Sequence, residues 1–526
     1  MRFLSSRWAP AVVAAAVTGA FALWNPPLRD LAAHTFRAEY FEQHGFAIWN
    51  GSWYGGHYLP AYSALFPPLA ALLSPVWVAA AAAVASAHLF DGLVRTRWGE
   101  QARPAGLWFA ALGALALLAN GWLVFALGTA FALGSLRAVQ LGRNRLAVVL
   151  AVGAALSSPV AAVFLALVVV IGMRRRGLAI AVGVLVPLAV LGFLFPEGGE
   201  FPFWFSAWWP LALFCGLALL AIRGIGSERD VRLVVAAYLG LATLAAVAPN
   251  PLGGNMTRLG SLFGGPLLLA LVLARAPQRL RAPVVIAALL VGLAWQVITP
   301  IRQTSESLGD PSTERAYYEP VKAWLAAHGA ERDRIEIPHT FGHWETAYVS
   351  PDFSLARGWL RQLDIERNNL FYDGREPTHA RYRRWLHDKG VRWVAASDAR
   401  LDYSAVDEDD LIRERPTYLR PRARLEHWRL YEVVGGPRLV RPRDGGRAVL
   451  DALEPESFTL DVVRPGLFEV RVRSSPYWRV DQGAACVGEE GDWTLVRADT
   501  PGPVRVSMAF SASAALRAAL GRERRC

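Results

Sequence analysis

The stretch from Pro26 to Pro60 gathers side chains that could move a proton and hold an anion. Two prolines at its start cannot continue a helix from upstream, and Gly45 suits a helix exit, so the sequence predicts a helix between them. At 3.6 residues per turn, Asp30, His34 and Arg37 share one face of that helix. We therefore expect these three to be the catalytic residues, with Asp30 as the base.

The second half of the same stretch is aromatic and cannot be regular helix. Asn50-Gly51 and Gly55-Gly56 are turn signals, and rings crowd around them. We expect this segment to form an aromatic shelf beside the charged helix face. Its predicted ligand-binding residues are Trp49, Trp53, Tyr54 and His57.

The elements that must position these residues are apolar. The chain has 526 residues, of which 53% are hydrophobic and only 19% charged, and its mean hydropathy is +0.26. Residues 1–299 therefore read as a polytopic α-helical membrane domain of about eleven spans. The apolar runs are Trp8–Trp24, Ala61–Phe90, Pro104–Leu118, Trp122–Gly134, Leu146–Ser157, Pro159–Ile171, Leu178–Phe195, Leu211–Ile222, Val231–Val247, Ser261–Ala274 and Pro283–Ile298.

Arginine placement predicts the topology, because short cytoplasmic loops collect Lys and Arg. All basic clusters fall on one side if the amino terminus is cytoplasmic. An odd number of spans then puts everything after Thr299 outside the plasma membrane. The first span could instead be a signal peptide, since Met1–Arg7 is basic, but the polar loop that follows needs a fixed anchor. The clusters are Arg2 and Arg7; Arg95, Arg97 and Arg103; Arg137, Arg143 and Arg145; Arg174 to Arg176; Arg223, Arg229 and Arg232; and Arg275, Arg279 and Arg281.

These arginines also account for much of the net charge of +11. They form no basic stripe interleaved with aromatics on one soluble module, so we expect no nucleic-acid partner. The partners that the sequence predicts at this point are membrane lipids.

Two further outer loops carry candidate residues. Pro196–Pro210 contains Glu197 and Glu200, the only candidates for a metal site, in a setting that also reads as an interfacial aromatic belt. Asn250–Gly260 is rich in glycine and has Arg258 as its only full charge. Arg258 either clamps a phosphate or extends along the membrane surface.

The remainder of the chain has the composition and periodicity of soluble domains. Residues 300–435 alternate helix and strand patterns, as in Ala316–His328 and Val391–Ala396, which predicts an extracytoplasmic α/β domain. Residues 436–526 show short alternating runs separated by Gly and Pro, which predicts a small β-sandwich with a basic tail. Whether Cys486 and Cys526 form a bridge stays open.

One segment of the α/β part, His339–Asp373, is unusually rich in His, Trp, Arg, Asp and Asn. Such a mixture is costly to bury without partners and is typical of loops that bind polar ligands. It could equally be a contact surface between domains. Its predicted binding residues are Trp344, Arg357, Trp359, Arg361 and Asp364.

The order of features from Asp30 onward resembles a known family. An acidic residue after the first span, then Arg37, then Gly45, then a Trp- and Tyr-rich segment is similar to the first outer loop of the GT-C superfamily of integral-membrane glycosyltransferases. Bacterial membrane proteins labelled 6-pyruvoyl-tetrahydropterin synthase-related resemble it more closely than oligosaccharyltransferase catalytic subunits do.

The resemblance implies hexosyl or pentosyl transfer outside the membrane from a polyprenyl-phosphate donor to a glycan, lipid or protein acceptor of the cell envelope. It assigns Asp30 the role of base or acceptor-positioning group. The second acidic motif of metal-dependent members has no clear counterpart beyond Glu197 and Glu200, so no cofactor is certain and a divalent metal (Mg²⁺ or Mn²⁺) stays open.

Two other functions stay open. A flippase or exporter of a lipid-linked sugar would share the aromatic loops but needs a polar path across the membrane, which the apolar runs do not show. A non-catalytic assembly protein for envelope polysaccharide would fit if Asp30 only stabilises the start of its helix.

Overall fold

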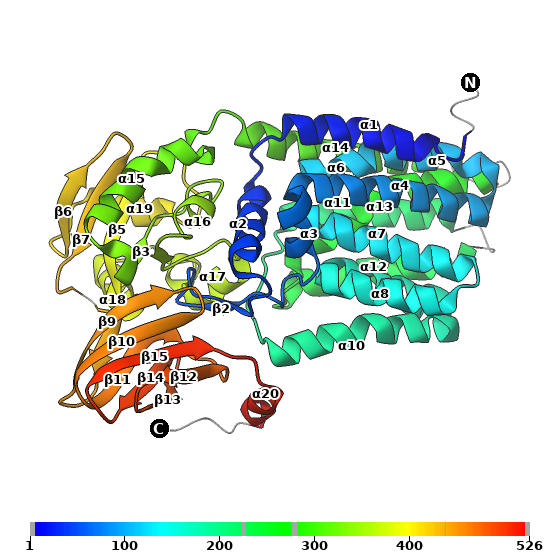
Figure 1. Cartoon of the computed structure of the whole chain (residues 1–526). Coiled ribbons are helices and arrows are strands. Elements are labelled where there is room, and N and C mark those ends of the chain that lie inside the picture. The colour runs from blue at the N-terminus through cyan, green and yellow to red at the C-terminus, as the bar shows by residue number, and fades with distance from the viewer. Residues whose placement is uncertain (1–5, 224–227, 276–281, 437, 521–525) are drawn as a thin grey trace. The chain divides into compact units, whose positions relative to one another are not determined.

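The computed structural model of the chain (Figure 1) is helical in its first three hundred residues and rich in strands after them. It divides into two compact units. Unit 1 comprises Met1–His34, Tyr62–Leu191 and Glu200–Leu308, and unit 2 comprises Thr35–Ala61, Gly192–Gly199 and Gly309–Cys526. The structure describes residues 6–223, 228–275, 282–436, 438–520 and 526. The predicted cytoplasmic Arg2, Arg279 and Arg281 lie outside the described residues.

Unit 1 is built from apolar helices rich in Ala, Leu, Val and Gly, which lets neighbours approach closely. A Cβ atom on Gly128 of α7 would lie 2.7 Å from the Ser158 Cβ and 2.8 Å from that of Ala161. A π-helical turn, Phe109–Gly113, joins α5 to α6. The helices are α1 (Ala9–Trp24), α3 (Phe66–Leu73), α4 (Pro75–Trp98), α5 (Arg103–Trp108), α6 (Ala114–Ala119), α7 (Leu123–Gln140), α8 (Asn144–Ser157), α9 (Pro159–Met173), α10 (Leu178–Leu194), α11 (Phe205–Ile222), α12 (Arg229–Val247), α13 (Thr257–Arg275) and α14 (Ala282–Ser307).

The helices make the chain a multi-pass membrane protein, but the predicted count of about eleven spans is not confirmed. In the described part of the chain seven helices are long and apolar enough to cross a membrane, or up to eight if a bent pair counts as one span. The difference arises because α8, α9 and α10 are apolar but have only 10–17 residues each. Each of the eleven predicted runs coincides with one or more helices.

Several arginine-bearing helix ends meet at one place in unit 1. Glu228, just before α12, accepts hydrogen bonds from Arg97 of α4 at 2.9 Å and from Arg275 of α13 at 3.0 Å. The Trp98 indole N–H donates to the same carboxylate at 3.2 Å. Two of the predicted basic clusters, those of Arg97 and Arg275, therefore lie on one side, as the positive-inside pattern requires.

The predicted helix of the polar stretch is α2 (Arg29–His44), which forms an angle of 81° with α1. It ends before Gly45, whose φ of +67° is the left-handed conformation that favours glycine after a helix. Unlike α1, α2 is rich in charged and polar residues, so we treat it as lying outside the span. Its residues up to His34 belong to unit 1 and those from Thr35 to unit 2.

Unit 2 contains a five-stranded mixed sheet in the order β4-β3-β5-β7-β6. β3 runs parallel to β4 and β5, whereas β7 is antiparallel to β5 and β6. The bounds are β3 (Arg334–Glu336), β4 (Ser354–Leu355), β5 (Val391–Ser397), β6 (Leu419–Arg424) and β7 (Trp428–Val433), with helices α15 (Arg315–Ala327), α16 (Glu345–Tyr348), α17 (Arg361–Arg367), α18 (His379–Lys389) and α19 (Val406–Arg413). Tyr382, Leu386, Val394 and Ile412 are fully buried in its core.

The rest of unit 2 has two antiparallel four-stranded sheets, ordered β12-β15-β10-β9 and β13-β14-β11-β8. Alternate residues such as Phe458, Leu460, Phe468 and Val470 are buried, as the two-residue period of strands requires. The bounds are β8 (Val440–Pro442), β9 (Arg447–Glu454), β10 (Ser457–Arg464), β11 (Gly466–Arg473), β12 (Trp478–Gln482), β13 (Ala485–Glu490), β14 (Trp493–Ala498) and β15 (Gly502–Met508), followed by α20 (Ala512–Ala519).

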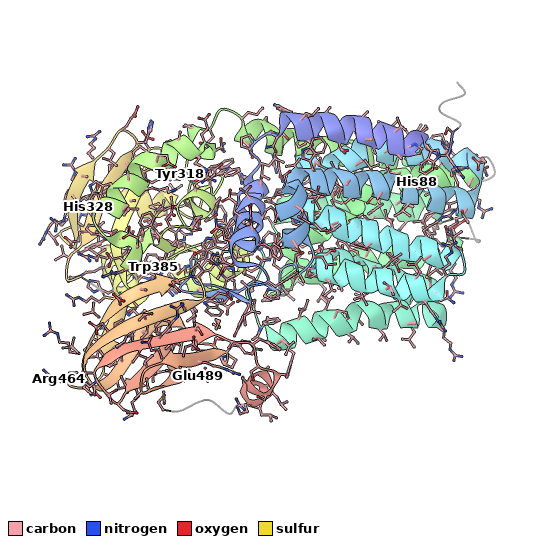
Figure 2. The ribbon with its side chains drawn as sticks, in the orientation of Figure 1. His88, Tyr318, His328, Trp385, Arg464 and Glu489 are labelled. Atoms are coloured by element: carbon pink, nitrogen blue, oxygen red, sulfur yellow. A yellow bond between two sulfur atoms is a disulfide. The ribbon has the colours of Figure 1, made fainter. Side chains whose placement is uncertain are left out.

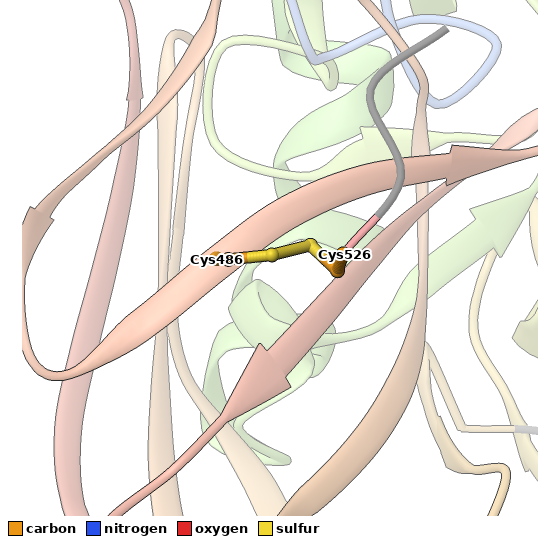
Figure 3. The surroundings of a disulfide bond; sticks show 2 residues. All are labelled: Cys486 and Cys526. Atoms are coloured by element: carbon orange, nitrogen blue, oxygen red, sulfur yellow. A yellow bond between two sulfur atoms is a disulfide. The ribbon is translucent and has the colours of Figure 1, made fainter.

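A disulfide resolves the cysteine question that the sequence left open. Cys486 of β13 is bonded to Cys526, with their Cα atoms 5.8 Å apart (Figure 3). The third cysteine, Cys215, is free and buried in α11. The bridge fastens the carboxyl terminus to an edge strand of the second sheet.

Candidate functional site

Asp30 lies in the first turn of α2 against a tight turn between α6 and α7. Gly121 of that turn has φ +71°, and a Cβ atom there would lie 2.8 Å from the Asp30 Cβ. Desolvation raises the pKa of the Asp30 carboxyl to about 6, while the charges of Arg258 and Arg29 act in the opposite direction. A carboxylate with such a pKa can accept a proton near neutral pH.

Arg258 lies in the first turn of α13 within the same unit. Its guanidinium carbon is 5.1 Å from the centre of the Trp122 ring and 5.4 Å from that of Phe125. A small cavity of about 30 Å³ adjoins this place and is lined by Trp122, Thr257 and Ser261 among others. The structure therefore brings together Asp30 and Arg258, which are far apart in the sequence.

His34 and Arg37 follow Asp30 along α2. The His34 side chain is buried, with its ring 5.3 Å from that of Phe66 and 6.3 Å from that of Tyr62. Arg37 is also buried and is counted with unit 2. The helix carries both residues, but they belong to different packing environments.

The aromatic stretch forms a short hairpin of β1 (Trp49–Asn50) and β2 (His57–Tyr58) inside unit 2. The Trp53 indole N–H donates to the Ser350 hydroxyl at 2.9 Å, and its ring stacks on His57. The Tyr54 hydroxyl donates to the Leu360 carbonyl at 2.9 Å. The four predicted shelf residues Trp49, Trp53, Tyr54 and His57 are all fully buried.

These rings therefore pack against protein groups in this structure, and their sugar-binding role stays a prediction. Burial lowers the pKa of His57 well below its ordinary value, and the nearby charges of Arg367 and Arg37 act in the same direction. His57 is thus neutral at physiological pH.

The charged residues of the His339–Asp373 segment form a buried network in unit 2. The Arg357 guanidinium donates to Asp364 at 2.6 Å and to Glu408 at 3.2 Å. Arg361 donates to Asp402 at 2.9 Å. The Arg357 charge and hydrogen bonds to the carboxylate outweigh burial and hold the pKa of Asp364 well below its ordinary value, so the acid is ionised.

The two tryptophans of this segment differ in exposure. Trp344 is buried and stacks on Tyr348, with ring centres 5.1 Å apart, whereas Trp359 is half-buried. Of the five residues predicted to bind a ligand here, Arg357, Arg361 and Asp364 form ion pairs within unit 2, and their ligand-binding role stays a prediction.

The partners Asp402 and Glu408 were missed by the sequence analysis. Glu408 lies in an acidic run at the start of α19, a pattern typical of a solvated first turn, yet its side chain is fully buried. No local pattern marks them as partners of Arg357 and Arg361, because the pairing joins residues that are far apart in the sequence.

The role of Glu197 and Glu200 as metal ligands stays a prediction. Glu197 accepts a hydrogen bond from the Tyr58 backbone N–H at 2.5 Å and pairs with Arg367 at 3.2 Å. Glu200 is exposed and is counted with the other unit. In the described part of the chain, one group has donor atoms within 4.8 Å of one another, namely His339, His343 and Glu345.

The side chains of these three residues already take part in hydrogen bonds within the protein. His339 Nδ1 lies 2.8 Å from Glu345, whose second oxygen accepts from the Thr340 hydroxyl at 2.6 Å. An Arg361 guanidinium nitrogen is 3.3 Å from His343 Nε2. With a cation this close to one donor nitrogen, the cluster fits a structural network better than a metal site.

Comparisons with known proteins give structural neighbours only. No protein-family model matches the chain, and no curated protein matches it. Two cryo-EM structures of the arabinofuranosyltransferase AftD from mycobacteria, one of them a point mutant, are similar at 16% identity. The mutant has a TM-score of 0.48 over 98% of this chain, and the other has 0.45 over 97%. This chain spans only 60% and 57% of the length of those proteins. Both TM-scores lie below 0.5, and no function is assigned to this chain from these two structures.

Proposed function

We propose that this chain is a GT-C type membrane glycosyltransferase that moves a sugar from a polyprenyl-phosphate donor to a cell-envelope acceptor outside the membrane. The observation that carries the proposal is the placement of Asp30 beside Arg258. A carboxyl with a pKa of about 6 and a guanidinium within its electrostatic reach are the two groups that such a transfer needs.

In the proposed step, Asp30 accepts the proton of the acceptor hydroxyl as that oxygen attacks the anomeric carbon of the donor sugar. The bond between this carbon and the phosphate oxygen breaks, and the phosphate leaves with the electron pair. Arg258 stabilises the departing negative charge through charge-assisted hydrogen bonds. His34, one turn after Asp30, holds the helix face against Phe66 and is a positioning residue.

The proposed transfer step uses no metal ion. Of the predicted candidates Glu197 and Glu200, Glu197 is paired with Arg367. Metal dependence, with Mg²⁺ or Mn²⁺ as the natural ions to test, stays a separate question for the purified protein.

The disulfide supports the proposed topology. A bridge between Cys486 and Cys526 forms and persists in an oxidising compartment, as expected for a carboxyl-terminal part outside the plasma membrane. A polyprenyl-phosphate donor on the outer leaflet would be within reach of such an enzyme.

The test is the Asp30→Asn variant assayed in proteoliposomes with polyprenyl-phosphate-linked sugars. The amide keeps the shape of the side chain but cannot accept the proton, so the transfer rate should fall by roughly 10²–10⁴. Glu39→Gln is the matched control: Glu39 lies on the same helix and pairs with Arg315, so its loss should leave the rate unchanged.

An Asp30→Asn protein that transfers sugar at the parental rate would overturn the catalytic assignment. In that case Asp30 contributes only its charge at a helix start, about 0.3–1 kcal/mol, as a non-catalytic assembly protein would require. Movement of intact lipid-linked sugar across the vesicle membrane without transfer would identify a flippase instead.

A further inference from the structure

An open groove of about 600 Å³ lies within unit 2, between the α/β layer and the antiparallel sheet β13-β14-β11-β8. It is lined by α18, by the short turn after α17, by β8 and β11, and by the turn that precedes β14. Its lining residues carry six Lys or Arg side chains against three Asp or Glu, and two of the six, Arg367 and Arg381, are paired with carboxylates outside the lining. Those used in the argument are Arg384, Trp385, Lys389, Arg471, Asp492 and Trp493.

A buried cation lies directly behind this lining. The Arg334 side chain is 1% exposed, and its guanidinium donates to the Lys389 carbonyl at 2.6 Å and to the Arg471 carbonyl at 2.7 Å. Among the residues that the structure describes, no carboxylate forms an ion pair with it. A buried charge without an opposite charge is costly, so the groove contains positive charge that an anion would neutralise.

Lys389 is a second cation that forms no ion pair with a carboxylate among the described residues. Its ammonium donates to the Arg367 carbonyl at 2.7 Å, and burial lowers its pKa to about 7. This value includes the charges of Arg473, Arg334 and Arg367, which act in the same direction as burial, and that of Asp492, which opposes them. Asp492 is itself paired with Arg473 at 3.0 Å.

An aromatic ring lies at the centre of these charges. Arg334, Lys389 and Arg473 all approach the Trp493 ring, at 5.8, 5.8 and 5.3 Å from its centre. Trp493 is half-buried and lines the groove, as does Trp385, which is labelled in Figure 2. Indole faces beside cations suit a ligand that combines apolar C–H surface with negative charge.

We propose that this groove binds an anionic saccharide, a sugar unit that bears a phosphate or a carboxylate group. The arginine and lysine side chains take the anionic group through charge-assisted hydrogen bonds, and the half-buried Trp493 indole takes the C–H face of the sugar. The proposal does not depend on the transfer reaction, because the groove lies wholly within unit 2 whereas Asp30 and Arg258 belong to unit 1.

The test measures binding of three small probes to the full chain in nanodiscs by calorimetry. Glucose 1-phosphate and glucuronate carry the two anionic groups, and glucose carries neither. We expect at least one charged probe to bind at least tenfold more tightly than glucose, and the tighter one identifies the anionic group. Equal affinity for all three probes, or no binding of either charged probe, would overturn the proposal.

Variants locate the binding. Lys389→Met should weaken binding of the charged probe at least tenfold, and Arg384→Gln, at an exposed position that tolerates change, at least threefold. Arg464→Gln is the control, because Arg464 is an exposed arginine of β10 outside the groove (Figure 2). Unchanged affinity in both groove variants would refute the assignment, even if the probe binds elsewhere.

The pH dependence gives an independent readout. Glucuronate stays ionised between pH 6 and 8, so a change in its affinity over that range reports the protein. Because Lys389 is protonated below about pH 7, glucuronate should bind more tightly at pH 6 than at pH 8. Lys389→Arg should bind well at both values. A wild-type affinity that does not vary with pH would contradict the role given to Lys389.

Discussion

At the scale of single residues, the environment of Asp30 sets the protonation state on which the proposed transfer depends. Its carboxyl is desolvated enough to raise the pKa to about 6 although two arginines oppose the shift. A base with this pKa is ionised in most molecules at pH 7 and is still basic enough to accept a proton.

This environment predicts the pH profile of the reaction. The base must be deprotonated to act, so kcat/KM should rise with pH through about 6 and level off above it. Below that value it should fall about tenfold per pH unit. The measurement is kcat/KM between pH 4.5 and 8 on protein that is shown to be folded over the range. A profile that is flat down to pH 4.5 would exclude Asp30 as the titrating base.

Arg258 should show the preference of a residue that binds the leaving group. Arg258→Gln removes the charge that would stabilise the departing phosphate and should lower kcat by roughly 10²–10³. Arg258→Lys keeps the charge but loses the guanidinium fork and its stacking on Trp122, so only part of the rate should return. Equal loss in both variants would point to a packing role instead.

At the scale of elements, the short turn at Gly121 packs against the face of α2 that carries Asp30. Gly121 and Gly142 have nearly the same left-handed conformation, with φ of +71° and +72°. A side chain at Gly121 would meet Asp30, whereas nothing lies within 4 Å of a Cβ atom at Gly142. Substitutions at the two glycines therefore distinguish the effect of backbone strain, which both share, from displacement of Asp30, which only Gly121 can cause.

The comparison of Gly121→Ala with Gly142→Ala uses this difference. Each substitution should cost roughly 1–2 kcal/mol of stability from backbone strain. Only Gly121→Ala should also lower kcat, because its methyl group pushes on the base. The readouts are thermal unfolding and initial rates. If both variants kept full activity, the Gly121 turn would not position Asp30.

The buried network of unit 2 makes its own prediction for stability. Arg357→Gln leaves Asp364 and Glu408 buried without their cation and should cost about 3–5 kcal/mol. Arg413→Gln removes an exposed arginine from buried Asp409, which keeps its pair with Arg429, so it should cost only about 0–1 kcal/mol. Proteolytic susceptibility and thermal unfolding of the full chain would compare them. Similar losses in both variants would show that the network contributes little.

At the scale of the whole molecule, the disulfide reports the side of the membrane on which the carboxyl-terminal part lies. Intact cells treated with a membrane-impermeant reductant and then an impermeant maleimide should show labelling at Cys486 and Cys526. A Cys486→Ser, Cys526→Ser double variant is the control, because it keeps only the buried Cys215. Labelling that appears only after the cells are opened would reverse the proposed topology.

The sequence by itself determined the features that local physics controls. Apolar runs predicted the membrane helices, the prolines before Arg29 and the glycine after His44 predicted α2, and alternating patterns predicted the strands of the carboxyl-terminal part. Composition and short-range periodicity suffice for these, because a helix or strand depends mainly on neighbours in the chain.

Only the tertiary structure decided which distant residues meet. It placed Arg258 near Asp30, paired Arg357 with Glu408, joined Cys486 to Cys526 and buried the aromatic hairpin that the sequence presented as a shelf. It also gathered Arg334, Lys389 and Trp493 around one groove. No local pattern encodes such contacts, since long-range packing and the need to pair buried charges select them among many alternatives.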